Sequence, residues 1–278
     1  MRKALSQPAR SVKRKRPNIF VASFAAAGAL LLLFVLLPLF STLIGTPVAA
    51  LWETLADTQV QSALALTFYA AAWATALVML TGVPLAYLLA RYDFMGKRWV
   101  EGVVNLPVVV PHTAAGIALL MVFGRQAPVG RALGAVGLHF TDDVPGIVVG
   151  MLFVSLPYLV NTAREAFAMV DPELEKVAQT MGASRWQAFL YVTLPLAWRG
   201  IVAGAVMMWG RGISEFGAVV ILAYYPKIIP VLVYERFAGF GLNAARPVAV
   251  ILILASLAVF VLLQVLLVPK RETIGGEK

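Results

Sequence analysis

Residues 19–44 read IFVASFAAAGALLLLFVLLPLFSTLI, and this stretch shows which solvent the chain folds in. It contains no charged residue. At about 1.5 Å per residue, a helix of this length exceeds the roughly 30 Å hydrocarbon core of a bilayer. The apolar core of a secretory signal is only about 7 to 15 residues long. We therefore interpret residues 19–44 as a retained membrane-spanning helix.

Similar apolar stretches recur along the whole chain, in which 60% of the residues are hydrophobic and only 13% are charged. Soluble domains are typically about half apolar and a quarter charged. The pattern predicts an all-α polytopic membrane protein with six spans. The expected spans are Ile19–Ile44, Ser62–Ala90, Val103–Phe123, Val144–Asn161, Pro195–Leu222 and Pro247–Val268. Pro107 and Pro111 predict a kink in the third, which shapes either helix packing or a pathway.

The distribution of positive charge predicts that both termini are cytoplasmic. Six spans place both termini on one side. Of the 23 lysines and arginines, 17 fall on that side, 5 fall on the other, and Arg211 lies inside a span. Cytoplasmic loops carry such an excess of basic residues. Residues 1–18 would form a basic tail, residues 19–269 one membrane domain and residues 270–278 a second tail. The formal charge of +9 therefore indicates a topological anchor or lipid-headgroup contact, and no nucleic acid.

The sequence lacks the residues that several chemistries need. It has no cysteine, which excludes disulfides and thiol catalysis. It has no phosphate loop of the GxxxxGK[ST] type. His112 and His139 are the two histidines, and we interpret both as structural or incidental residues. We therefore expect no catalytic residue, no metal site and no cofactor in this chain.

The connection Thr162–Arg199 has a helical pattern of its own outside the membrane. Asp171 followed by Pro172 is typical of an N-cap and first helical position. Apolar side chains then recur at helical spacing on one face, with polar residues elsewhere. The apolar positions are Leu174, Val177, Ala178 and Met181. This face should either rest on the lipid surface or bind a partner.

A glycine turn and a second helix should follow. Gly182 is typical of the residue that ends a helix, and Ser184 with Gln187 has the spacing of a capping box. Trp186, Phe189 and Leu190 supply the apolar side of the second helix.

At these residues the chain resembles the permeases of binding-protein-dependent ABC importers. Their cytoplasmic motif runs Glu-Ala-Ala, three residues, Gly, nine residues, then Ile-x-Leu-Pro. Residues 192–195, Val-Thr-Leu-Pro, follow Gly182 at that spacing, whereas Lys176 occupies the Glu position and an acid stands one residue earlier at Glu175. The resemblance implies a coupling helix that docks on a separate ATPase subunit, which binds ATP and Mg. The implied coupling residues are Leu174, Glu175, Lys176, Ala178, Met181, Gly182, Ala183 and Trp186.

Arg211 and Glu215 lie inside the fifth expected span, four residues apart and so on one helical face. Because a charge at the bilayer centre costs about 3 kcal/mol or more, both should face protein or water. They either lock helix packing or, together with Ser214, line and gate a pathway for an anion.

Two nearby stretches, residues 211–218 (RGISEFGA) and residues 223–227 (AYYPK), resemble the corresponding part of oxyanion permeases, most closely the molybdate/tungstate branch. Sulfate permeases share the Glu-Phe-Gly core at residues 215–217. The resemblance implies a homodimer of this chain, two ATPase subunits and an external oxyanion-binding protein, all at the cell membrane. Tyr224, Tyr225 and Lys227 would lie at the outer boundary, either as an interfacial belt or as a docking site for the binding protein.

Other classes of membrane protein fit the sequence less well. A secondary transporter would normally show internal repeats and broken helices at matching positions, and we find no such repeat. A channel should carry a selectivity-filter signature. A membrane enzyme would need a nucleophile, base or metal constellation, which Arg211 and Glu215 do not supply.

Overall fold

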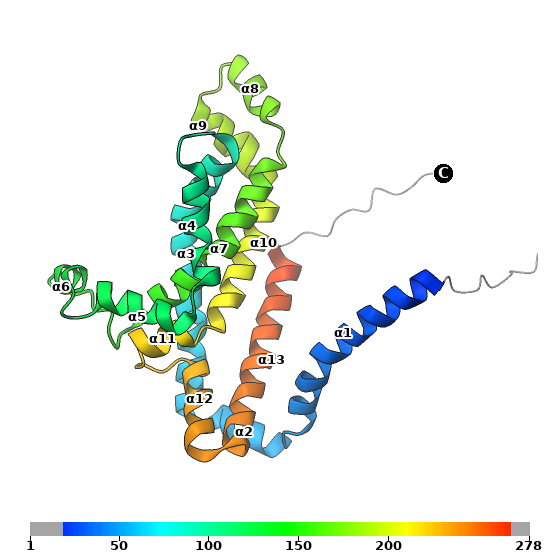
Figure 1. Ribbon diagram of the computed structural model, residues 1–278, viewed down its shortest axis with the longest axis vertical. Coiled ribbons are helices and arrows are strands. Elements are labelled where there is room, and N and C mark those ends of the chain that lie inside the picture. The colour runs from blue at the N-terminus through cyan, green and yellow to red at the C-terminus, as the bar shows by residue number, and fades with distance from the viewer. Residues whose placement is uncertain (1–18, 268–278) are drawn as a thin grey trace, which may run out of the picture. The chain divides into compact units, whose positions relative to one another are not determined.

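The computed structural model describes residues 19–267, and every regular element in that range is a helix (Figure 1). The expected tails at residues 1–18 and 270–278 lie outside the described residues. The chain divides into two compact units, Met1–Pro47 and Val48–Lys278. The all-α prediction is confirmed.

The first unit contains helix α1, Ile19–Ile44, whose mean hydropathy of 2.7 is the highest among the candidate spans of the described residues. Its bounds are those expected from the sequence. They coincide because an uncharged run bounded by polar and glycine residues needs no tertiary partner to define its ends.

Residues 48–267, the described part of the second unit, form twelve α-helices and one π-helical segment. They are α2 (Val48–Ala56), α3 (Thr58–Arg91), α4 (Lys97–Val109), α5 (His112–Phe123), α6 (Pro128–Gly134), α7 (Val144–Ala168), α8 (Pro172–Thr180), α9 (Arg185–Ala188), η1 (Phe189–Thr193), α10 (Leu194–Ile213), α11 (Gly217–Leu222), α12 (Ile229–Phe240) and α13 (Leu242–Leu267).

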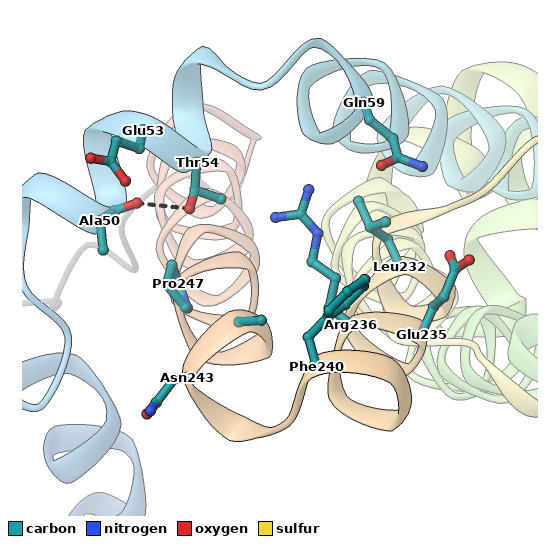
Figure 2. A pocket seen from close by; sticks show the side chains of 11 residues that line it. Ala50, Glu53, Thr54, Gln59, Leu232, Glu235, Arg236, Phe240, Asn243 and Pro247 are labelled. Atoms are coloured by element: carbon teal, nitrogen blue, oxygen red, sulfur yellow. Dashed lines mark hydrogen bonds between the residues drawn. The ribbon is translucent and has the colours of Figure 1, made fainter.

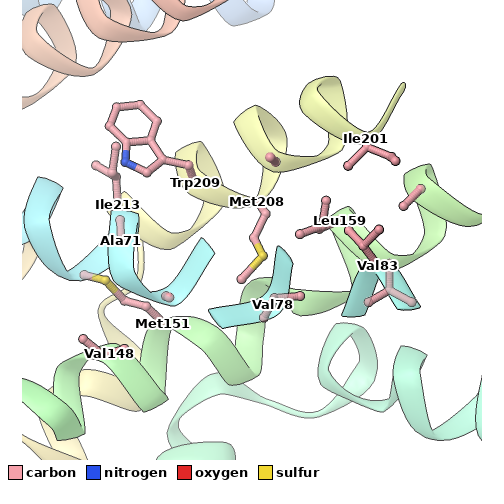
Figure 3. Packing of buried hydrophobic residues seen from close by; sticks show 14 of the residues in the cluster. Ala71, Val78, Val83, Val148, Met151, Leu159, Ile201, Met208, Trp209 and Ile213 are labelled. Carbon is pink, nitrogen blue, oxygen red and sulfur yellow. The ribbon is translucent and has the colours of Figure 1, made fainter. Parts of the chain in front are cut away.

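Helices α3, α7 and α10 pack side by side and hold the core of the second unit (Figure 3). Small residues on α3, including Ala70, Ala71 and Ala74, are buried there and let the backbones approach closely, as is usual for helices packed in lipid. Met151 and Met208 fill the space between the three helices. A rigid three-helix core of this kind supports polar groups at its edges.

The third expected span bends at the predicted place, and the bend divides it into two helices. Helix α4 ends at Val109, Pro111 stands at the N-cap of α5, and the two helices meet at 115°. Pro111 has no N–H to continue the ladder, and its ring disfavours a helical residue before it. Five helices of the described residues are long and apolar enough to cross a membrane, or six if this bent pair counts as one span.

The fifth expected span is also interrupted. Helix α10 ends at Ile213 and α11 begins at Gly217, so Glu215 lies in the connection and not on a continuous helix. The polar sequence Ser214-Glu215 ends the apolar run, and the Glu215 side chain pairs with Arg211 of α10 and with groups of α5 and α11.

Four shorter helices mark the two ends of the second unit. Helices α8 and α9 lie at one end, beyond α7 and α10, and α2 and α12 lie at the other (Figure 1). Helix α7 continues to Ala168, beyond its expected end at Asn161, and Arg164 in this extension pairs with Glu101 of α4. The two ends are the places where the sequence predicts cytoplasmic and outer contacts.

Candidate functional site

A buried carboxylate stands where the two interrupted spans meet. The side chain of Glu215 is 0% exposed, and its Oε2 lies 2.8 Å from Nδ1 of His112 and 3.0 Å from Nη2 of Arg211. His112 is the first residue of α5 and Arg211 lies in the last turn of α10. The predicted pairing of Arg211 with Glu215 is therefore confirmed, although the two residues do not share one helix.

The second oxygen of Glu215 holds the next helix in place. Its Oε1 accepts a hydrogen bond of 2.8 Å from the backbone N–H of Ala218, in the first turn of α11. At Gly217 an added Cβ would come within 2.7 Å of Cβ of His112, so only glycine lets α11 approach α5 this closely. One carboxylate thus joins α5, α10 and α11.

The cationic side of this cluster remains open. The side chains of Arg211 and His112 are 21% and 39% exposed. Nη2 of Arg211 also lies 2.9 Å from Nδ1 of His112, a nitrogen that can either donate to Glu215 or accept from Arg211 but not both. Nη1 of Arg211 donates to Oγ of Ser214 over 3.2 Å. An approaching anion would therefore meet the Arg211 guanidinium and the His112 imidazole, while the Glu215 carboxylate is buried on their far side.

His112 is the residue of this cluster that sequence reasoning missed. It lies 103 positions from Glu215 in the chain, and no local pattern links the two. The available signal was its place directly after Pro111, at the start of a helix that follows a break. Within the described residues no group of three or more acidic, histidine or cysteine side chains could hold a metal ion.

The helix pair at the α8 end has the predicted caps. Oδ1 of Asp171 accepts from the N–H of Glu173, and Ser184 with Gln187 forms a reciprocal capping box. Gly182 has φ +97°, a left-handed conformation that favours glycine. The second helix differs from expectation, because α9 is only four residues long and passes through the π-helical η1 into α10.

Most of the apolar stripe of this helix pair is exposed in the described residues, whereas Phe189 packs against Tyr87 and Phe167. Helix α8 contains no buried residue, and Leu174, Val177, Met181 and Trp186 are exposed. Lys176 pairs with Glu173 on the surface of α8, and that hydrogen bond raises the pKa of the Lys176 ammonium. The surface is therefore apolar at its centre with a charged flank, as in helix-in-groove recognition.

Glu175, one residue before Lys176, points away from the exposed face of α8 and towards α3 and η1. Its Oε1 accepts from Nε of Arg91 at 2.9 Å and from Oγ1 of Thr193 at 2.7 Å, and its Oε2 accepts from the hydroxyl of Tyr87 at 3.0 Å. Tyr87 and Arg91 lie at the end of α3, and Thr193 ends η1. Sequence reasoning did not anticipate these three partners, which are 18 to 88 residues away.

A cavity of about 470 Å³ lies at the opposite end, between α2, α12 and α13 (Figure 2). Arg236 on its wall forms an ion pair with Asp57. Nearby, Nζ of Lys227 lies 2.7 Å from Glu235, so its charge is already paired, while Tyr224 and Tyr225 are exposed. These aromatic rings offer contact surface at the end remote from α8.

Long apolar helices around a small-residue core, with buried charges at helix breaks, define a multi-pass membrane transport subunit. Residues 82–272 match the family described as binding-protein-dependent transport system inner membrane component. The chain belongs to this family. It is 44% identical over 90% of its length to the molybdate/tungstate transport system permease protein of Pyrococcus furiosus, covering 96% of that protein.

Further comparisons agree. The molybdate/tungstate permease of Thermococcus kodakarensis is 43% identical over 87% of this chain and 93% of its own length. The sulfate transport system permease of Escherichia coli is 32% identical over 75% of this chain and 77% of its own length. A bacterial alginate ABC transporter, solved with a pentasaccharide-bound periplasmic protein, shares the fold at TM-score 0.71 and 16% identity, over 88% of this chain and 92% of that one. These relatives are transport permeases and not enzymes.

Proposed function

We propose that this chain is the membrane-spanning permease of an ATP-driven importer that moves an oxyanion, tungstate or molybdate, into the cytoplasm. The observation that carries the proposal is the identity of 42–44% to permeases named for molybdate/tungstate transport, against 30–32% to those named for sulfate. Sulfate or thiosulfate is the alternative substrate. Tungstate and molybdate are nearly isosteric dianions, which small differences in hydrogen-bond geometry would distinguish.

The chain would act in a larger assembly in the cell membrane. A second copy of the chain, two ATPase subunits that bind ATP and Mg, and an external oxyanion-binding protein complete it. We place both termini and the α8–α9 end in the cytoplasm, because the basic residues concentrate there. The end with α2 and α12 would then face outward.

The α8–α9 end would dock in a groove of the ATPase. Its exposed apolar residues would supply the contact, and the fixed turn at Gly182 would set the angle between the two helices. The proposed coupling residues are Leu174, Glu175, Lys176, Ala178, Met181, Gly182, Ala183 and Trp186.

Arg211, Ser214 and Glu215, joined by His112, would line the route of the anion. A guanidinium and an imidazole backed by a buried carboxylate attract an oxyanion while keeping the net charge low, so that the anion is bound weakly enough to leave. At the outer end, Tyr224 and Tyr225 would contact the binding protein, with Lys227 held against Glu235 beneath them.

Elemental mass spectrometry of cells tests the function. Cell-associated tungsten, molybdenum and sulfur would be compared between a deletion strain and the strain complemented with the intact gene, at scarce oxyanion. We expect tungsten or molybdenum to fall on deletion and to return on complementation. A change in sulfur alone would replace the substrate with sulfate, and no change in any of the three would remove the oxyanion assignment.

A further inference from the structure

We propose that Glu175 is a positioning residue that ties coupling helix α8 to α3 and α10 of its own chain, and that it passes movement of α8 into the membrane core. The inference rests on the proposed function. It assigns Glu175 a role distinct from that of the exposed residues around it, which would contact the ATPase.

The Glu175 side chain attaches α8 to neighbouring elements of the same chain. Among the described residues, every side-chain hydrogen bond from α8 to another helical element ends on the Glu175 carboxylate. The other polar bonds of α8 stay within the helix or its cap, as with Lys176 and Glu173. Since α8 buries no residue, apolar packing alone does not hold it. Besides the backbone connections to α7 and α9, a force on α8 would therefore reach the core through this carboxylate.

The three donors come from two elements that belong to different spans. Tyr87 and Arg91 are at the end of α3, and Thr193 is the residue directly before α10. The contacts of 2.7 to 3.0 Å are near the optimum, and hydrogen bonds weaken steeply as distance and angle depart from it. A shift of α8 must therefore either carry α3 and α10 along or break a bond.

Breaking these bonds is strongly unfavourable because both side chains of the pair are largely shielded from water. The side chains of Glu175 and Arg91 are 13% and 8% exposed. An ion pair of this kind costs much more to separate than a surface pair, since each charge would be left without water or a partner. The exposed pair between Lys176 and Glu173 on the same helix lacks this property.

Two features would allow the attachment to take a second arrangement. Nη2 of Arg91 is buried without a hydrogen-bond partner, so a displaced Glu175 could exchange the Nε contact for Nη2. Thr193 ends the π-helical segment Phe189–Thr193, and such segments are rare and concentrate at functional sites. An extra residue in that turn can be released into regular helix, which would shift Thr193 relative to α10.

The test uses the complete complex of permease, ATPase and binding protein in proteoliposomes, with tungstate uptake and ATP hydrolysis measured in the same vesicles. Glu175→Gln removes the charge and keeps the shape, and Glu173→Gln is the matched control on an exposed residue of the same helix. We expect Glu175→Gln to lower tungstate imported per ATP hydrolysed by about tenfold or more, with Glu173→Gln unchanged. Tyr87→Phe and Thr193→Val, which each remove one donor, should lower the ratio less.

The ratio separates coupling from folding, because a variant that merely assembles poorly loses uptake and hydrolysis together. An unchanged ratio in Glu175→Gln would overturn the inference. Equal losses of uptake and hydrolysis in Glu175→Gln, Tyr87→Phe and Thr193→Val would also overturn it. Absence of ATP-driven uptake by the unaltered complex would instead refute the proposed function, and the inference with it.

Discussion

Gly182→Val offers a sharp test of the turn between α8 and α9. Gly182 has φ +97°, and no atom lies within 4 Å of the position a Cβ would take. The added Cβ therefore has open space around it, and we attribute the cost to backbone strain. A β-branched residue at positive φ is a genuine outlier, and such strain amounts to about 1–3 kcal/mol.

That strain would shift the helix pair away from the arrangement that we propose docks on the ATPase. Converted to a population, about 1–3 kcal/mol is a factor of about 5 to 150. In the reconstituted complex we expect ATP hydrolysis to become uncoupled from oxyanion uptake by a factor in that range. Gly182→Asn is the matched control, because asparagine tolerates the left-handed region and should lose much less.

Equal uptake per ATP for glycine and valine, at equal amounts of assembled complex, would refute the reasoning. Equal losses for valine and asparagine would also count against it, since the effect would then follow side-chain size and not backbone conformation.

Two further predictions concern ion pairs. Glu215→Gln should destabilise the protein by about 3 kcal/mol because it leaves the Arg211 cation beside a neutral group. The double variant Arg211→Met with Glu215→Gln should cost less than Glu215→Gln alone. Thermal unfolding in detergent measures both variants, and a double variant as unstable as the sum of the single ones would contradict this prediction. At Asp57, burial alone would raise the carboxyl pKa, but the hydrogen bonds from Arg236 and from the N–H of Gln59, with the charge of Arg236, outweigh it and lower the pKa. The stability from ionised Asp57 is therefore present above its unfolded pKa of about 3.9 and is lost as the pH falls through the lower folded value. Asp57→Asn keeps a good N-cap, and at pH 7 it should unfold at a lower temperature than the unaltered protein, by an amount worth at most about 1 kcal/mol. This difference in unfolding temperature should disappear below that pH range. A difference that does not depend on pH would refute the role given to the Asp57–Arg236 pair.

The sequence by itself determined the features that depend on neighbours in the chain. The bounds of α1, the caps at Asp171 and Ser184 and the left-handed turn at Gly182 all follow from hydropathy or from bonds within a few residues. Such features form wherever the segment is placed, since lipid requires helices and a helix end requires a cap. The family resemblance also rested on these local motifs.

Only the tertiary structure decided how the polar side chains meet. Pro111 predicted a kink, but the sequence does not show whether a proline bends a helix or breaks it. That depends on whether neighbouring elements pack against the two halves. Here α11 packs against α5, and α4 and α5 meet at 115°. His112 reaches Glu215 across 103 residues, and Glu175 reaches Tyr87 across 88. Buried charges take whichever partners the packed helices bring within hydrogen-bond distance, and that choice is made by the arrangement of the helices and not by spacing along the chain.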